Sequence, residues 1–68
     1  MQRNVLTSRE KEIFTLLTQN KTTREIAILL NISEKTVRNH ISNTMQKLGV
    51  KGRAPAVVEL IKLKELTL

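Results

Sequence analysis

Residues 33–48 read SEKTVRNHISNTMQKL and carry the clearest helical pattern in the chain. On a 3.6-residue period, one stripe of this segment is almost wholly apolar and comprises Val37, Ile41, Thr44, Met45 and Leu48. Ser33 is a favourable N-cap, because its hydroxyl can accept a hydrogen bond from a free backbone N–H. Gly49 follows the last periodic residue, where helices often end in a left-handed glycine. The pattern therefore predicts a helix of about four turns.

The opposite face of this helix is polar and contains almost no acidic side chain. Its members are Arg38, Asn39, Ser42, Asn43 and Gln46. These side chains can hydrogen-bond the edges of bases, whereas an acid in their place would repel phosphate. An ordinary solvated helix face looks the same, so the rest of the chain has to decide between the two interpretations.

The positive charge of the chain is concentrated around this helix. The 68 residues have a formal net charge of +6 and a pI near 10.4. Seven basic and two acidic residues lie between Lys21 and Arg53, which leaves five basic and four acidic residues for the rest. This distribution predicts a polyanionic partner that contacts the central helix.

Composition argues against several classes of function. The chain has no cysteine, no aspartate and a single histidine, so we expect no disulfide, no metal site, no cofactor, no small-molecule ligand and no catalytic residue. No apolar run approaches the ~20 residues of a membrane span, and no signal peptide opens the chain. We expect a cytoplasmic, nucleoid-associated, non-enzymatic protein with one domain over residues 1–68, a loose segment 1–5 and a candidate tail 64–68.

A first helix is predicted before the central one. Thr7 and Glu10 have the spacing of a capping box, in which each side chain bonds the backbone N–H of the other residue. The apolar face of this helix consists of Ile13, Phe14, Leu16 and Leu17. Asn20 is expected to end it, since asparagine tolerates the left-handed conformation.

A second helix over residues 23–30 begins at a second capping box, formed by Thr22 and Glu25. Residues 31–33 then make a tight connection to the central helix. Two helices joined in this way, the second one basic and polar on its outer face, describe a helix-turn-helix. Any two helices can be so joined, so this feature alone is moderately specific.

The last helix, expected over about Arg53 to Leu63, has more apolar positions than one core-facing stripe needs. A domain of this size should not expose them, so a second apolar face suggests a partner chain. The alternative is a segment that wraps around its own core.

Four blocks of sequence together have a family resemblance. LTSREKEIFTLL, T-REIA, ISEKTVRNHISN-MQKLGV and R-AV follow one another between Leu6 and about Leu63. They resemble the LuxR/FixJ/GerE-type helix-turn-helix family, and the central run is most similar to stand-alone members that regulate late sporulation genes. The resemblance implies an all-α, compact four-helix domain that binds double-stranded DNA. Its third helix would enter the major groove, its second would cross the DNA backbone and its fourth would form a homodimer.

The resemblance also implies roles for individual residues. It assigns base contacts to Arg38, Asn39 and Ser42. It assigns contacts with the phosphate backbone to Thr22, Thr23, Lys35, Thr36, His40, Lys47 and Arg53. It assigns the dimer interface to Val58, Ile61, Lys62 and Glu65.

The chain departs from the family pattern in the second helix, where Ile28 and Leu29 stand at positions that are usually polar. We expect these two residues to form a contact patch for RNA polymerase or a neighbour, or to pack against the N-terminal segment.

The sequence thus predicts a dimeric, sequence-specific transcription regulator that binds a pseudo-palindromic site. One alternative is the detached C-terminal output domain of a larger response regulator. An alternative from a different class is a basic helical adaptor that binds an acidic protein.

Overall fold

The described chain forms four helices, three of which begin at a side-chain cap. In the computed structural model of the chain, the order is α1 (Ser8–Thr18), α2 (Thr23–Leu30), α3 (Glu34–Leu48) and α4 (Arg53–Lys62). The structure describes residues 6–66, so the expectation of a loose segment 1–5 lies outside the described residues. No strand occurs within residues 6–66, and the predicted all-α, four-helix fold is confirmed.

Both predicted capping boxes are present. The Thr7 hydroxyl accepts from the Glu10 N–H, and a Glu10 carboxylate oxygen accepts from the Thr7 N–H at 2.9 Å. Thr22 and Glu25 repeat this exchange at the start of α2. These reciprocal bonds satisfy backbone donors that a helix N-terminus otherwise leaves without partners.

Left-handed residues end α2 and α3. Asn31 has a φ of 56°, and Gly49 has the left-handed conformation that the sequence predicted for it, with a φ of 68°. The end of α1 is slightly different from the prediction: the helix stops at Thr18, Gln19 is its C-cap, and Asn20 adopts the left-handed conformation after it.

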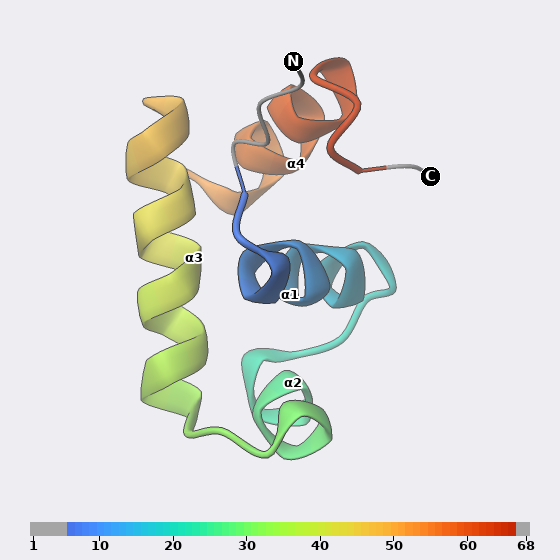
Figure 1. Ribbon diagram of the computed structural model, residues 1–68, viewed down its shortest axis with the longest axis vertical. Coiled ribbons are helices and arrows are strands. Elements are labelled where there is room, and N and C mark those ends of the chain that lie inside the picture. The colour runs from blue at the N-terminus through green and yellow to red at the C-terminus, as the bar shows by residue number, and fades with distance from the viewer. Residues whose placement is uncertain (1–5, 67–68) are drawn as a thin grey trace.

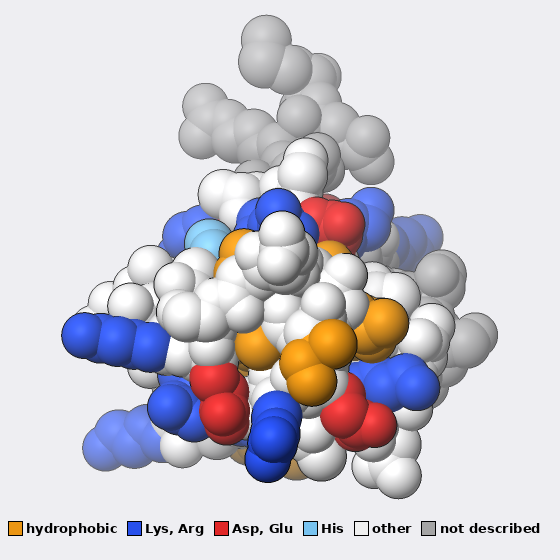
Figure 2. All heavy atoms as spheres, turned by 90° about the horizontal axis from the view of Figure 1, so that it is seen from below, with side chains coloured by type: hydrophobic (Ala, Val, Ile, Leu, Met, Phe, Trp, Pro, Cys, Tyr) orange, Lys and Arg blue, Asp and Glu red, His pale blue; other side chains and the backbone are white. Residues whose placement is uncertain are grey.

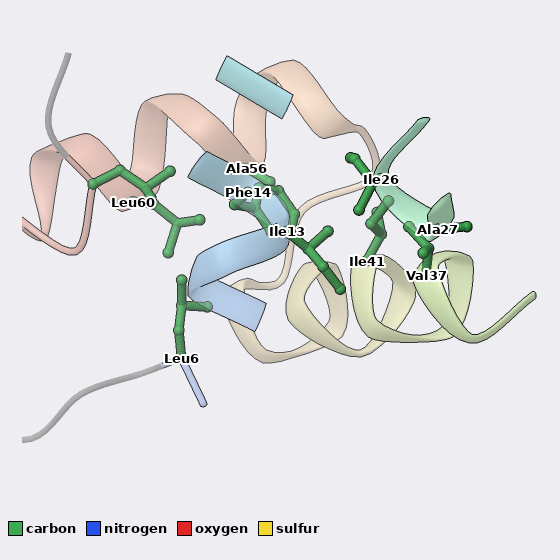
Figure 3. Close-up of a cluster of buried hydrophobic side chains, with 10 residues drawn as sticks. Leu6, Ile13, Phe14, Ile26, Ala27, Val37, Ile41, Ala56 and Leu60 are labelled. Atoms are coloured by element: carbon green, nitrogen blue, oxygen red, sulfur yellow. The ribbon is translucent and has the colours of Figure 1, made fainter. Parts of the chain in front are cut away.

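The longest helix, α3, runs along one side of the molecule, and α4, α1 and α2 are stacked against its other side (Figure 1). It packs against all three of them. Val37, Ile41 and Thr44 are fully or almost fully buried, as the periodicity predicted. Around them lie side chains from the other helices, chiefly Ile13, Phe14, Ile26, Ala56 and Leu60 (Figure 3).

The two ends of the described chain meet at one side of this core. Leu6 is 7% exposed and Leu66 is 4% exposed, so both belong to the hydrophobic core. A Glu65 carboxylate oxygen accepts a hydrogen bond of 3.1 Å from the Leu6 N–H. The candidate tail is therefore packed as far as Leu66, while residues 67–68 lie outside the described part of the chain.

Candidate nucleic-acid interface

The outer face of α3 presents all three residues that were predicted to contact bases. Arg38, Asn39 and Ser42 are all exposed, while Val37 and Ile41 next to them are buried. The Ser33 hydroxyl accepts from the Thr36 N–H at 3.0 Å and so caps this helix where the face begins. The buried stripe thus holds α3 against the core, and its polar side is left for a partner.

The seven predicted phosphate-contacting residues are distributed along α3 and at the starts of its neighbours. Thr22 and Thr23 lie at the N-terminus of α2, and Lys35 and Thr36 lie in the first turn of α3. His40 is partly exposed further along α3. Lys47, in the last turn of α3, and Arg53, at the start of α4, are both exposed. The two helix N-termini add backbone N–H groups, which favour anions.

An acidic residue lies within this basic face. One carboxylate oxygen of Glu34 accepts from Arg38 Nη1 at 2.8 Å and from the Thr23 hydroxyl at 2.9 Å. The hydrogen bond from Thr23 is the main reason why the pKa of Glu34 is lowered, and the charge of Arg38 adds to the effect. Arg38 is thus attached to α2 through Glu34, a link that the sequence pattern did not reveal.

A second ion pair joins α1 to the far end of α3. Lys47 Nζ lies 2.6 Å from a carboxylate oxygen of Glu10, which is 3% exposed as a residue. Burial raises the pKa of Glu10, but the hydrogen bonds from Lys47 and Thr7 outweigh it, so the pKa is lowered. Lys47 therefore has a structural partner in addition to its predicted contact with phosphate, which stays a prediction.

Sequence reasoning assigned Glu10 to the capping box alone. The pairing with Lys47 spans 37 residues, and a local spacing rule cannot detect a pair so distant in sequence. The one available signal was the placement of a carboxylate at a core-facing position of α1, where an acid requires a partner.

The predicted dimer surface is only partly exposed. Val58 is 52% exposed and Lys62 is exposed, whereas Ile61 packs in part against the core and Glu65 bonds the Leu6 N–H. Leu63, which the prediction did not include, is 48% exposed just after α4. The apolar surface available near this helix is thus centred on Val58 and Leu63.

A further apolar surface lies on α2, where Ile28 is 72% and Leu29 is 59% exposed. Figure 2 views the molecule from the end where α2 lies, and there hydrophobic side chains are surrounded by both basic and acidic ones. Leu29 and Leu30 also line a hollow against α1, together with Leu16, Lys11 and Glu12.

The described residues contain neither a candidate metal site nor a candidate membrane span. Between residues 6 and 66, no three histidine or acidic side chains are grouped so that they could bind a metal ion. None of the four helices in that range has the length and apolar character needed to cross a membrane.

Comparison with known proteins relates this interface to a family. Residues 4–60 match the family described as bacterial regulatory proteins, luxR family. The chain is 70% identical to the spore germination protein GerE of Bacillus subtilis (strain 168) over 94% of its own length and 86% of that protein. The solved structure of the transcription factor GerE superposes with a TM-score of 0.93 at 62% identity, covering 96% of this chain and 97% of that one.

Longer proteins contain a similar segment. The transcriptional regulatory protein DegU of Brevibacillus brevis is 51% identical over 87% of this chain, which spans 25% of DegU. The response regulator ChrA has a solved structure that matches 97% of this chain with a TM-score of 0.85 at 35% identity, over 33% of its own length.

Proposed function

The chain belongs to the luxR family of bacterial regulatory proteins and is a DNA-binding transcription regulator, not an enzyme, and from this premise we propose that it acts as a homodimer on a pseudo-palindromic operator. The single observation that carries the proposal is the exposed, polar outer face of α3, with Arg38, Asn39 and Ser42 opposite the buried Val37 and Ile41.

In this proposal α3 enters the major groove and reads bases. Arg38 donates to O6 and N7 of a guanine, Asn39 pairs with an adenine, and Ser42 reaches a base directly or through water. Residues that flank this face hold the phosphates, namely Thr22, Thr23, Lys35, Thr36, His40, Lys47 and Arg53. Their positions along α3 and at the starts of α2 and α4 support the assignment.

The homodimer is proposed to form through α4. The half-exposed side chains of Val58 and Leu63 support this, because apolar groups of that size are more stable when a partner covers them. Ile61, Lys62 and Glu65 would complete the interface. A two-fold axis would place the two α3 helices in successive major grooves, about 10 bp apart.

The biological setting is proposed from the most similar relatives. The likeness to a spore germination protein of Bacillus subtilis supports a role in late sporulation. The protein would act at the chromosome in the cytoplasm. Ile28 and Leu29 on α2 would provide a contact patch for RNA polymerase, since they are exposed on a helix other than α3 and α4.

Selection from a randomised duplex library at two salt concentrations tests the operator proposal. We expect an enriched motif with two-fold symmetry that persists at the higher salt. Affinity should still fall by about 10³–10⁵ between 50 and 200 mM salt if a dimer contacts roughly 6–10 phosphates. A bound pool that stays random would exclude base reading by α3. An absence of duplex binding at low salt, with binding to an acidic protein, would favour the adaptor alternative.

A further inference from the structure

Glu34 is the only acidic residue in α3, and it lies at the beginning of the face proposed to read DNA. Its side chain is 40% exposed and lies 2.8 Å from Arg38 Nη1, the group proposed to contact a base. A carboxylate here repels phosphate and lowers the affinity for any duplex. Electrostatics alone therefore gives no reason for an acid at this position.

The hydrogen bonds of Glu34 give such a reason. The same carboxylate oxygen accepts from Arg38 Nη1, at 2.8 Å, and from the Thr23 hydroxyl, at 2.9 Å. Thr23 is the first residue of α2, so its hydroxyl holds the carboxylate from a second helix. An exposed ion pair between residues four apart on one helix is otherwise weakly ordered.

Arg38 keeps its capacity to read a base while it is held. A guanidinium has five N–H donors in a planar fork, and the contact with Glu34 engages Nη1. The side chain of Arg38 is 55% exposed, so the remaining donors can reach solvent or a base. The lowered pKa of Glu34 means that the carboxylate stays ionised, and so continues to hold Arg38, at neutral pH.

We propose that Glu34 is a positioning residue for DNA recognition: anchored by Thr23, it orients the Arg38 guanidinium toward its base. The inference rests on the proposed function, because it requires that Arg38 contacts a base. Ordering the arginine before it meets DNA avoids an entropic cost on binding. The negative charge of Glu34 weakens binding to every duplex alike. The ordering of Arg38 therefore provides the discrimination, and the charge keeps the total affinity low.

The test compares Glu34→Gln with Glu12→Gln. Glutamine keeps the shape of the side chain and removes its charge. Glu12 is a matched control, because it forms an exposed ion pair with Arg9, at 3.4 Å, three residues away on α1. Each variant is titrated against the selected operator and against an operator changed at the base pair where Arg38→Ala relaxes selection, at one salt concentration.

We expect Glu34→Gln to reduce the affinity ratio between the two duplexes by roughly two- to tenfold, the cost of ordering one long side chain. Glu12→Gln should leave the ratio unchanged. Both variants should keep the circular dichroism spectrum of the parent. Glu12→Gln should also keep its unfolding midpoint, because it loses only an exposed ion pair. Glu34→Gln should have a slightly lower midpoint at neutral pH, because it also loses the ionised acceptor of the Thr23 hydroxyl.

A double-mutant cycle with Arg38→Ala separates the possible outcomes. If Glu34 acts through Arg38, Glu34→Gln has no effect on the ratio once Arg38 is alanine. A persistent effect would mean that Glu34 contacts a base itself, which would overturn the positioning role. An unchanged ratio in Glu34→Gln, with a reduced one in Arg38→Ala, would also overturn it and leave the proposed function intact. If Arg38→Ala alters discrimination at no base pair, the proposed base contact fails, and the inference fails with it.

Discussion

Arg38 and Lys47 are two cations of the same helix, and the structure gives them different surroundings. Arg38 is exposed and paired with an exposed acid, whereas Lys47 is paired with a buried one. Two basic residues that a sequence pattern assigns to the same polyanion can therefore contribute differently to stability and to recognition.

For Arg38→Ala we expect a loss of ~1–3 kcal/mol in binding to the operator and relaxed selection at one base pair. Lys35→Ala should weaken all duplexes alike and reduce the salt dependence by about one counterion. Titration of the operator and a random duplex at several salt concentrations measures both effects. Equal losses on the two duplexes for Arg38→Ala would contradict a base contact.

For Lys47→Met we expect the free energy of unfolding to fall by about 1–3 kcal/mol, since the buried Glu10 carboxylate loses a charged hydrogen-bond donor. This loss of stability should be smaller than the loss for a fully buried ion pair, because the Lys47 side chain is 39% exposed. Urea denaturation at pH 7 measures it. Lys11→Met, at an exposed position of α1, is the control and should change stability by less than about 0.5 kcal/mol. Equal stability of the two variants would argue against a structural role for Lys47.

At the scale of the helices, the sequence predicted most of the fold, because capping residues within one turn encode the starts of α1, α2 and α3. Thr7, Thr22 and Ser33 cap the three helices that they were predicted to cap. Contacts between helices were predicted less well. The links from Glu10 to Lys47 and from Thr23 to Glu34 depend on how helices pack, which periodicity does not encode.

The C-terminal residues also show that packing was predicted less well than the starts of helices. No sequence pattern indicated a packed segment after the last helix, yet Leu66 belongs to the core. Its burial depends on Lys64, which has a φ of 61° and turns the chain back toward α4. Lysine is not a residue whose presence signals a left-handed turn.

The end of α3 allows a direct test of local backbone preference. At Gly49, with a φ of 68°, an added Cβ would meet no atom within 4 Å. Gly49→Ala should therefore lower the free energy of unfolding by about 1–2 kcal/mol for conformational reasons alone. Gly49→Asn should cost less, because asparagine tolerates this region better. Thermal unfolding of the two variants provides the comparison, and an alanine variant as stable as the parent would show that this turn can adopt another conformation.

At the scale of the whole molecule, the lowered pKa values of three carboxylates predict how stability depends on pH. Hydrogen bonds lower the pKa of Glu25, and the pKa values of Glu10 and Glu34 are lowered as well. A group with a lowered pKa in the folded state contributes its full stability above the unfolded value, about 4.3 for glutamate. That contribution is lost as the pH falls through the folded values.

We therefore expect a constant urea midpoint between about pH 5 and 7 and a progressive decrease below about pH 4. Glu10→Gln should have a lower midpoint at neutral pH and a shallower decrease in acid. A midpoint that does not change between pH 5 and pH 3 would mean that folding does not lower the pKa of these carboxylates.

The oligomeric state is also a property of the whole molecule. If the proposed homodimer forms through α4, Val58→Asp should raise its dissociation constant by more than about tenfold, because it places a charge in an apolar contact. Since Val58 is 52% exposed, the monomer should still fold. Ile28→Asp is a matched control at a 72% exposed apolar position of α2, and it should leave dimerisation unchanged. Sedimentation equilibrium measures both, and an unchanged dimer in Val58→Asp would move the interface away from α4.

The hydrogen bond between the Leu6 N–H and Glu65 has a consequence for how this unit can be joined to others. It holds the start of the described chain beside its end, next to α4 and away from α2 and the first turn of α3 (Figure 1). A fluorescent label or a receiver module fused ahead of Leu6 would thus emerge close to α4 and leave the start of α3 uncovered. The same geometry would let a fused module act on the proposed pairing of subunits through α4 without touching Arg38, Asn39 and Ser42, the residues proposed to contact bases.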